Sequence, residues 1–369
     1  MKKLDWYIIK NFLVTFFFSI FLFVIITVVI DASEHADNFV QSKLGFYQIF
    51  VQFYLGFIPH MTALLFPLFV FIAVIFFTSK MAGRSEIIAI LASGISYNRW
   101  LKPYAIAGIF LAGMLWLGNM KLIPKANERR TSFETKYIDA NSSYERTIST
   151  TKINDDVQHL KIDSFTYGGF YNYDTSSKSS STFFGYVVKN NEIVKNFRAD
   201  RMFWDTVKGA NRWMLENVTT RTLVGISEVF KKTSLEPLAL QAKPNQLKRE
   251  KFTKDKMSST ELAAYIKKEK ASGSENINEL LIEQGRRHAT PVTVFLLTLI
   301  GAIIAGRKVR GGSGSHLAMG FIIAALFILA DKFSTVFCTK GNLNATLATW
   351  IPNIIFTFVM LYLYKKAPK

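Results

Sequence analysis

The residues that could carry catalysis in this sequence are few and widely separated. Hydrolysis or group transfer needs a nucleophile beside its base, a pair of carboxylates, or a metal ion. The single cysteine, Cys338, excludes an intrachain disulfide and any multi-cysteine metal site. The five histidines show no metal-ligand spacing, and we predict no catalytic residues, no metal site and no enzyme activity. They are His35, His60, His159, His288 and His316.

A glycine-rich stretch at Arg310–Ser315 has the composition of a phosphate-binding loop. It lacks the Gly-Lys-Ser/Thr ending that places a lysine on the phosphates of a nucleotide. A flexible connector between two apolar runs is the simpler interpretation. Any energy must then come from a gradient or from a partner that binds ATP, and we predict no cofactor in this chain.

A short segment at Ser79–Tyr97 has the pattern of an amphipathic helix between two apolar runs. Ser85 can cap this helix, and Glu86 lies in its first turn, where the helix dipole favours a negative charge. Gly94 ends it. Such a helix either lies at the lipid interface or docks into a groove of a cytoplasmic ATPase. Its apolar stripe consists of Ile87, Ile90 and Leu91.

Two lysines are predicted to lie near the non-cytoplasmic face of the membrane that the chain spans, and they are candidates for contact with lipid. Lys43 follows the first apolar run, and Lys332 follows Asp331 inside the fifth. One interpretation is that these charges mark helix ends in water. The other is that Lys332 and Lys43 pair with anionic lipid headgroups, because charges within a membrane are costly and usually functional.

The elements that position these residues are membrane-spanning helices. A helix rises about 1.5 Å per residue, so roughly 20 apolar residues cross a hydrocarbon core about 30 Å thick. The chain has 369 residues, of which 50% are hydrophobic, and five apolar runs come near this length without a charge, while a sixth is interrupted by Asp331 and Lys332. Pro59 and Pro67 are expected to kink the second. The predicted spans are Asn11–Ile30, Leu44–Ser79, Pro103–Met120, Ala289–Gly306, Leu317–Thr339 and Gly341–Tyr364.

The basic residues indicate the orientation of these spans. The net charge of +18 could suggest nucleic acid, but the lysines and arginines flank the apolar runs, which is typical of membrane proteins. They gather at both termini and in alternate short loops, so we predict that both termini are cytoplasmic and that nucleic acid is not a partner. The cytoplasmic set is Lys2, Lys3, Lys10, Lys80, Arg84, Arg99, Lys102, Arg307, Lys308, Arg310, Lys365, Lys366 and Lys369.

A long polar segment between the third and fourth spans is predicted to be an all-β domain on the opposite, outer side. We expect strands at Thr147–Ile153, His159–Thr166, Thr182–Val188, Glu192–Trp204, Arg212–Leu215 and Thr219–Leu223, with a loop at Tyr167–Ser181. After it, Ser258 or Ser259 caps a helix, and a second helix runs into the fourth span. The predicted parts are a first transmembrane half at 1–121, the β domain at 122–256, a helical connector at 257–285 and a second transmembrane half at 286–369.

Three segments together resemble the LptF/LptG permeases, the membrane subunits of the lipopolysaccharide-export ABC transporter. They are Pro59–Pro67 (PHMTALLFP), Ser85–Ser96 (SEIIAILASGIS) and Met257–Ile266 (MSSTELAAYI). The resemblance extends over essentially the whole chain, including the order of three spans, a β-rich insert and three spans. It implies an α-helical integral membrane protein with six transmembrane helices and a periplasmic, β-jellyroll-like insert.

The resemblance also implies partners and roles. The chain would form a heterodimer with a paralogous permease, driven by a cytoplasmic LptB-type ATPase dimer. An LptC-type bitopic protein and a periplasmic bridge protein would receive lipopolysaccharide extracted from the bacterial inner membrane. Glu86, with Arg84 nearby, would fall on the helix that couples to the ATPase.

The residues alone leave other functions open. A non-transporting membrane scaffold or sensor with a periplasmic ligand-binding domain needs no ATPase. A membrane-embedded enzyme would require the catalytic groups that are lacking from the sequence.

Overall fold

The structure, a computed structural model, divides the chain into two compact units, which we call the helical unit and the insert. The helical unit comprises Met1–Asn141, Lys254–Ala263 and Asn278–Lys369, and the insert comprises Ser142–Thr253 and Ala264–Ile277. The residues described are 3–138, 158–163, 165–174, 177–189, 192–206, 212–224, 227–240, 242–244, 253–272, 277–307 and 312–367.

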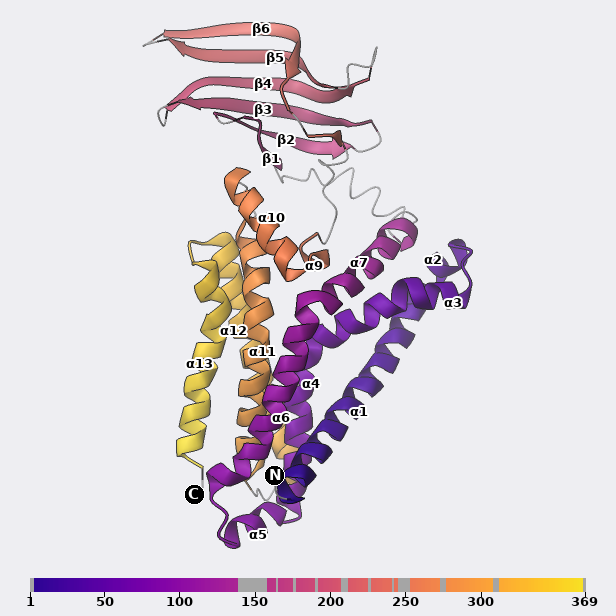
Figure 1. Cartoon of the computed structure of the whole chain (residues 1–369), viewed down its shortest axis with the longest axis vertical. Helices are drawn as coiled ribbons and strands as arrows, with labels where there is room; N and C mark the ends of the chain where they lie inside the picture. Colours follow the sequence, from indigo (N-terminus) through magenta and orange to yellow (C-terminus); the bar gives the residue numbers. More distant parts are fainter. Residues whose placement is uncertain are drawn as a thin grey trace. The chain divides into compact units, whose positions relative to one another are not determined.

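Long helices make up most of the helical unit (Figure 1). Within the described residues, six helices are long and apolar enough to cross a membrane, which confirms the six predicted spans. They are centred on α1 (Lys3–Glu34), α4 (Leu55–Gly83), α6 (Tyr97–Leu117), α11 (Ile277–Ala305), α12 (Gly312–Lys340) and α13 (Ala345–Lys365).

Shorter elements extend these helices. The second span starts early, because α3 (Phe46–Ile49) and the π-helical turn η1 (Phe50–Tyr54) lead directly into α4. The third continues beyond the predicted start of the β domain at 122, through η2 (Gly118–Leu122) and α7 (Ile123–Phe133) to η3 (Glu134–Ile138). A separate short helix, α2 (Ala36–Gln41), follows α1.

The core of the helical unit lies around α4 and α11. In the most apolar 18-residue stretch of α11, 67% of the residues are buried, against 6% in the corresponding stretch of α1 and 17% in that of α12. Gly301 allows the close approach of α4, since a Cβ atom there would lie 2.4 Å from Val74 Cγ1. Gly56 plays the same part between α4 and α7, where a Cβ would lie 2.4 Å from the main-chain oxygen of Ala126.

The insert contains an antiparallel sheet in which each strand pairs with the next in sequence, from β1 to β6. The predicted all-β character is therefore confirmed. One face carries a core that includes Phe170, Phe183 and Trp213. The strands are β1 (Gln158–Lys161), β2 (Thr166–Asp174), β3 (Ser179–Lys189), β4 (Glu192–Asp205), β5 (Arg212–Val224) and β6 (Ser227–Leu238).

Four strand predictions need correction, and a fifth lies outside the described residues. The strand predicted at His159–Thr166 is not continuous, because β1 ends at Lys161 and Thr166 begins the antiparallel β2. The predicted loop at Tyr167–Ser181 contains most of β2, whose Gly168 leaves space for the ring of Phe183. β5 is one strand where two were predicted. β6 was missed because it is a polar edge strand with lysines and Pro237, a composition that protects a sheet edge. The strand predicted at 147–153 is the one outside the described residues.

A transverse crease explains why β5 looked like two strands. Thr182 of β3 and Asn217 of β5 have positive φ angles of 52° and 53°, and the pairing register places both opposite Asp200 of β4. Buried residues on either side of this line are three apart in place of two, as with Leu215 and Val218. The apolar alternation therefore changes phase within each strand.

The connector after the sheet contains α9 (Thr253–Lys256) and α10 (Ser259–Ser272), and then α11 continues without a break into the fourth span. The predicted cap of α10 is Ser258, whose hydroxyl accepts the backbone N–H of Glu261 at 3.4 Å. Glu261 Oε2 in turn accepts the backbone N–H of Ser258 at 2.8 Å, which completes a capping box.

Candidate functional site

The predicted amphipathic helix is α5 (Glu86–Ala92), at the end of the helical unit where both chain termini lie (Figure 1). Ser85 precedes it in a left-handed conformation with φ of 60°, and its side chain makes no capping hydrogen bond. Gly94, with φ of 84°, follows the last turn, as expected for a helix stop. The helix is thus present as predicted, but its start is a tight turn instead of a serine cap.

The apolar stripe of α5 faces the chain's own helices. Ile87 is 2% exposed and belongs to the main hydrophobic core, and Ile90 and Leu91 pack against the same core. The outward side presents Ile88, which is 49% exposed, together with the small residues Ala89 and Ala92. The surface that α5 offers to a partner is therefore different from the stripe singled out in the sequence.

Polar contacts fix α5 and the adjoining helix to the start of α1. The hydroxyl of Tyr7 donates to Glu86 Oε2 at 3.3 Å, and Arg84 lies 3.8 Å from the other carboxylate oxygen of Glu86. Arg99 at the start of α6 donates to both carboxylate oxygens of the buried Asp5, at 2.8 and 2.7 Å. A displacement of α5 would therefore be transmitted directly to α1.

The two lysines proposed to meet lipid headgroups are both exposed, but the structure does not bring them together. Lys43 lies in the turn between α2 and α3, with φ of 56°, and Lys332 lies on α12, separated from that turn in Figure 1. Asp331, beside Lys332, accepts a hydrogen bond from Arg286 of α11 at 2.5 Å. Their contact with lipid stays a prediction.

The sequence reasoning missed a polar junction at the end of the helical unit opposite α5. Arg287 of α11 is 6% exposed and donates to the main-chain oxygens of Lys254 and Met257, at 3.0 and 2.8 Å. Asn127 of α7 donates to the main-chain oxygen of Asp255 at 3.0 Å. An Arg-Arg pair next to an apolar run was the available signal, and it could equally mark a helix end in water.

Burial affects the ionisation of the acidic residue in this junction. The pKa of the Asp255 carboxyl lies above its usual value because desolvation disfavours the charged form. The positive charges of Lys254, Arg130 and Arg287 act in the opposite direction without cancelling it. In this junction, Arg287 and Asn127 donate hydrogen bonds to main-chain oxygens of the connector.

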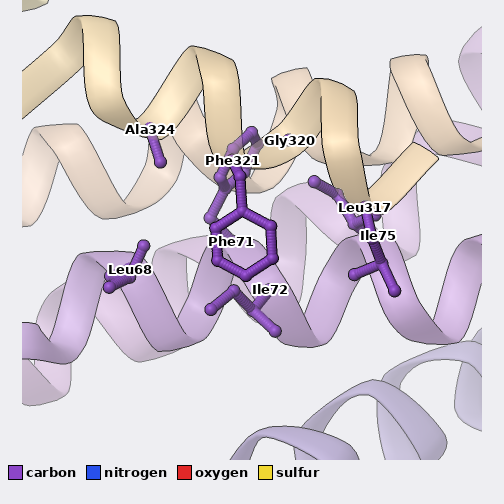
Figure 2. Close-up of a pocket in the computed structure, with 8 residues that line it drawn as sticks. All are labelled: Leu68, Phe71, Ile72, Ile75, Leu317, Gly320, Phe321 and Ala324. Atoms are coloured by element: carbon purple, nitrogen blue, oxygen red, sulfur yellow. The ribbon is translucent and has the colours of Figure 1, made fainter. Parts of the chain in front are cut away.

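Two hollows lie among the described residues, one in the helical unit and one in the insert. Figure 2 shows an apolar crevice between α4 and α12, where Phe71 and Ile75 face Leu317 and Phe321. The insert carries a hollow of about 580 Å³ on the sheet, which mixes aromatic side chains such as Tyr186 with polar ones. The crevice is lined by apolar residues and has no space for a water molecule, so it is a packing contact between α4 and α12.

The sequence matches the family model of the lipopolysaccharide export system permease LptF/LptG over residues 6–366. A search of curated proteins finds no match to the chain. The family match covers the six apolar helices and the antiparallel sheet between the third and fourth of them, in the order predicted. On this combination of helices, sheet and family match, the chain belongs to the lipopolysaccharide export permease family LptF/LptG.

Proposed function

We propose that this chain is the permease subunit of an ABC transporter that extracts lipopolysaccharide from the bacterial inner membrane and passes it to a periplasmic bridge. Membership of the LptF/LptG family supports a permease role in lipopolysaccharide export. ATP would be bound and hydrolysed by a separate LptB-type dimer in the cytoplasm. The chain itself would supply half of the lipid path and transmit force.

The orientation proposed for this function puts α5 and both termini in the cytoplasm and the insert in the periplasm. Its support is the basic end of the helical unit, where Arg99 pairs with Asp5 and Arg307 donates to the main-chain oxygen of Lys366. Basic residues in short connections favour the cytoplasmic side. The same end carries the helix proposed to meet the ATPase.

Proposed partners would cover the least buried helices. Among the described residues, few positions in the apolar stretches of α1 and α12 are buried. We assign these surfaces to the lipid cavity and to a paralogous LptF/LptG-type permease, with an LptC-type bitopic protein and the bridge protein beyond. The exposed Lys332 and Lys43 would then meet headgroup phosphates. Arg286 is less available for this role, because it already pairs with Asp331.

The observation that carries the coupling proposal is the division of α5 into two faces. Ile87 is buried and Glu86 is hydrogen-bonded to α1, so the helix is firmly attached to the spans. Ile88, Ala89 and Ala92 form a small, apolar outward surface suited to close docking. Force applied to this surface would reach α1 through Glu86 and Tyr7.

Substitution on each face of α5 tests the coupling. Ala89→Arg places a long charged side chain on the outward surface, so the ATPase recovered with the purified permease should fall by about tenfold or more, the scale of an interface hot spot. Tyr7→Phe, which removes only the internal hydrogen bond, should leave that recovery unchanged. An Ala89→Arg variant that kept its ATPase and its export would refute docking at this surface.

Glu86 provides a second, distinct test. Glu86→Arg removes the carboxylate that accepts the hydrogen bond of Tyr7 and places a second positive charge near Arg84. Lipid export should therefore fall even where the ATPase remains bound. Glu86→Gln keeps an acceptor oxygen and should retain most of the export. If the native complex contained no ATPase at all, a scaffold or sensor would become the better function.

A further inference from the structure

The guanidinium of Arg287 donates hydrogen bonds to main-chain oxygens of the connector. Lys254 lies in α9 and Met257 in the turn between α9 and α10, and the main-chain oxygens of both accept hydrogen bonds from Arg287 Nη atoms. The hydroxyl oxygen of Ser259 lies 3.4 Å from Arg287 Nη1, and Glu283 accepts from Arg287 Nε at 3.2 Å. Buried carbonyl groups need such partners, and an arginine can supply several from one side chain.

A second helix holds the same turn from another direction. Asn127 of α7 donates to the main-chain oxygen of Asp255, which lies between the two carbonyl groups held by Arg287 along the chain. Asn127 is 4% exposed, so this hydrogen bond is shielded from water. The chain is thus pinned to α7 and α11 at the point where it returns from the insert to the helical unit.

Arg286, the residue before Arg287, holds a different neighbour. It donates to Asp331 at 2.5 Å and to Thr335 Oγ1 at 2.8 Å, and both residues belong to α12. Successive residues of a helix point about 100° apart, so one α11 backbone can bind α12 and the connector at the same level. A movement of α12 can therefore reach the connector through two adjacent side chains of α11.

We propose that Arg287 is a positioning residue for lipid export, which fixes the α9–α10 connector to α11 so that displacement of the spans is carried to the insert. This proposal rests on the transport function proposed above. It concerns a step after ATPase docking, because Arg287 lies at the end of the helical unit opposite α5. The variants below therefore separate it from the coupling at α5.

The loss of Arg287 should release one segment and leave the rest in place. Arg287→Gln leaves buried carbonyl groups without donors, and a hydrogen bond to a charged group contributes about 1.5–3 kcal/mol, equivalent to tenfold or more in an equilibrium. In the purified complex, amide exchange in residues 253–263 should rise about tenfold. Lipid export should fall by a similar factor, while ATPase recovery and ATP hydrolysis remain at the level of the unsubstituted protein.

Arg286→Gln is the matched control, because it removes the same charge one residue away and loosens α12 instead of the connector. It should leave exchange in residues 253–263 unchanged. Arg287→Lys retains the charge and fewer donors, and should restore part of the export. If Arg287→Gln fails to fold, Asn127→Ala tests the same turn, with a smaller rise in exchange and a smaller loss of export.

Two results would overturn the proposal. Unchanged exchange in residues 253–263 would show that Arg287 does not hold the connector. Raised exchange with full export would show that the attachment is only structural. Failure of the transport function itself would look different, since the unsubstituted complex would then lack export or ATPase.

Discussion

At the scale of single residues, Ser258 and Glu261 stabilise the first turn of α10 through the charge state of one carboxyl. The Ser258 backbone N–H and hydroxyl both donate to Glu261 Oε2 at 2.8 Å, and these bonds lower the pKa of Glu261 because they favour its charged form. The stabilisation is therefore complete above the pKa that this carboxyl has in the unfolded chain. It is lost as the pH falls through the lower pKa of the folded protein.

Ser258→Ala should raise the pKa of Glu261 towards its usual value and loosen the start of α10. Removal of the hydroxyl eliminates one acceptor and one donor of the capping box, so amide exchange in the first turn should rise a few-fold at neutral pH. An NMR titration of the labelled glutamate carboxyl measures the pKa directly. Lys267→Ala, in an exposed later turn of α10, is the control, and an equal pKa in Ser258→Ala and the unsubstituted chain would contradict the capping assignment.

The sequence predicts which residues form the candidate site, but not which way their side chains face. The helix at Glu86 was expected from its cap, charge and apolar stripe, yet the sequence does not say whether Ile87, Ile90 and Leu91 face a partner or the chain itself. Ile87 is buried against the chain's own core and Ile90 and Leu91 are partly buried against it, while a role of this stripe in docking stays a prediction. The Arg286-Arg287 pair was visible in the sequence, but the role of Arg287 was not, because two of its partners are main-chain oxygens that any sequence would supply.

At the scale of elements, close helix contacts depend on a few glycines that periodicity does not single out. Gly56 lies against the backbone of α7, where an added Cβ would be 2.4 Å from Ala126 O and 2.8 Å from Arg130 N. A backbone cannot move aside as a side chain can. By contrast, a Cβ at Gly113 of α6 would meet nothing within 4 Å.

Gly56→Ala should therefore separate α4 from α7 and destabilise the helical unit by about 1–3 kcal/mol, as other overpacked contacts do. The thermal midpoint of the purified protein in detergent should fall by several degrees, and Gly113→Ala should leave it nearly unchanged. Equal midpoints for the two variants would contradict the close packing of α4 on α7.

The sheet illustrates which element predictions fail and why. Long apolar helices were predicted because hydropathy alone defines them. β5 was divided into two strands at the crease, where Asn217 adopts a positive φ and the alternation of buried residues changes phase. Gly168 and Gly169 suggested a loop, whereas Gly168 in fact makes room for the ring of Phe183 within β2. Both failures arise from contacts between strands, which a single segment does not reveal.

At the scale of the whole molecule, the proposed orientation places the α5 end of the helical unit and the insert on opposite sides of the membrane. The single cysteine, Cys338, is fully buried, so it contributes little background to cysteine labelling. Ser93 follows α5 and Ser234 lies on β6, and both residues are exposed. These positions report the two sides separately.

A membrane-impermeant maleimide added to cells with a permeabilised outer membrane should label Ser234→Cys and leave Ser93→Cys unlabelled. Disruption of the inner membrane should make Ser93→Cys reactive. The unsubstituted chain controls for Cys338. The reverse pattern, with Ser93→Cys labelled in intact spheroplasts, would invert the orientation and remove α5 from contact with a cytoplasmic ATPase.

The uneven burial of the spans has a consequence for how the protein is made. Chains are synthesised from the amino terminus at about 5–20 residues per second, so α1, α4 and α6 enter the bilayer before α11 exists. α11 supplies much of the core that they share, and the insert is translated in between. The first three helices must therefore be stable in the bilayer without α11 for on the order of ten seconds. Assembly of the permease waits for its most buried helix to arrive.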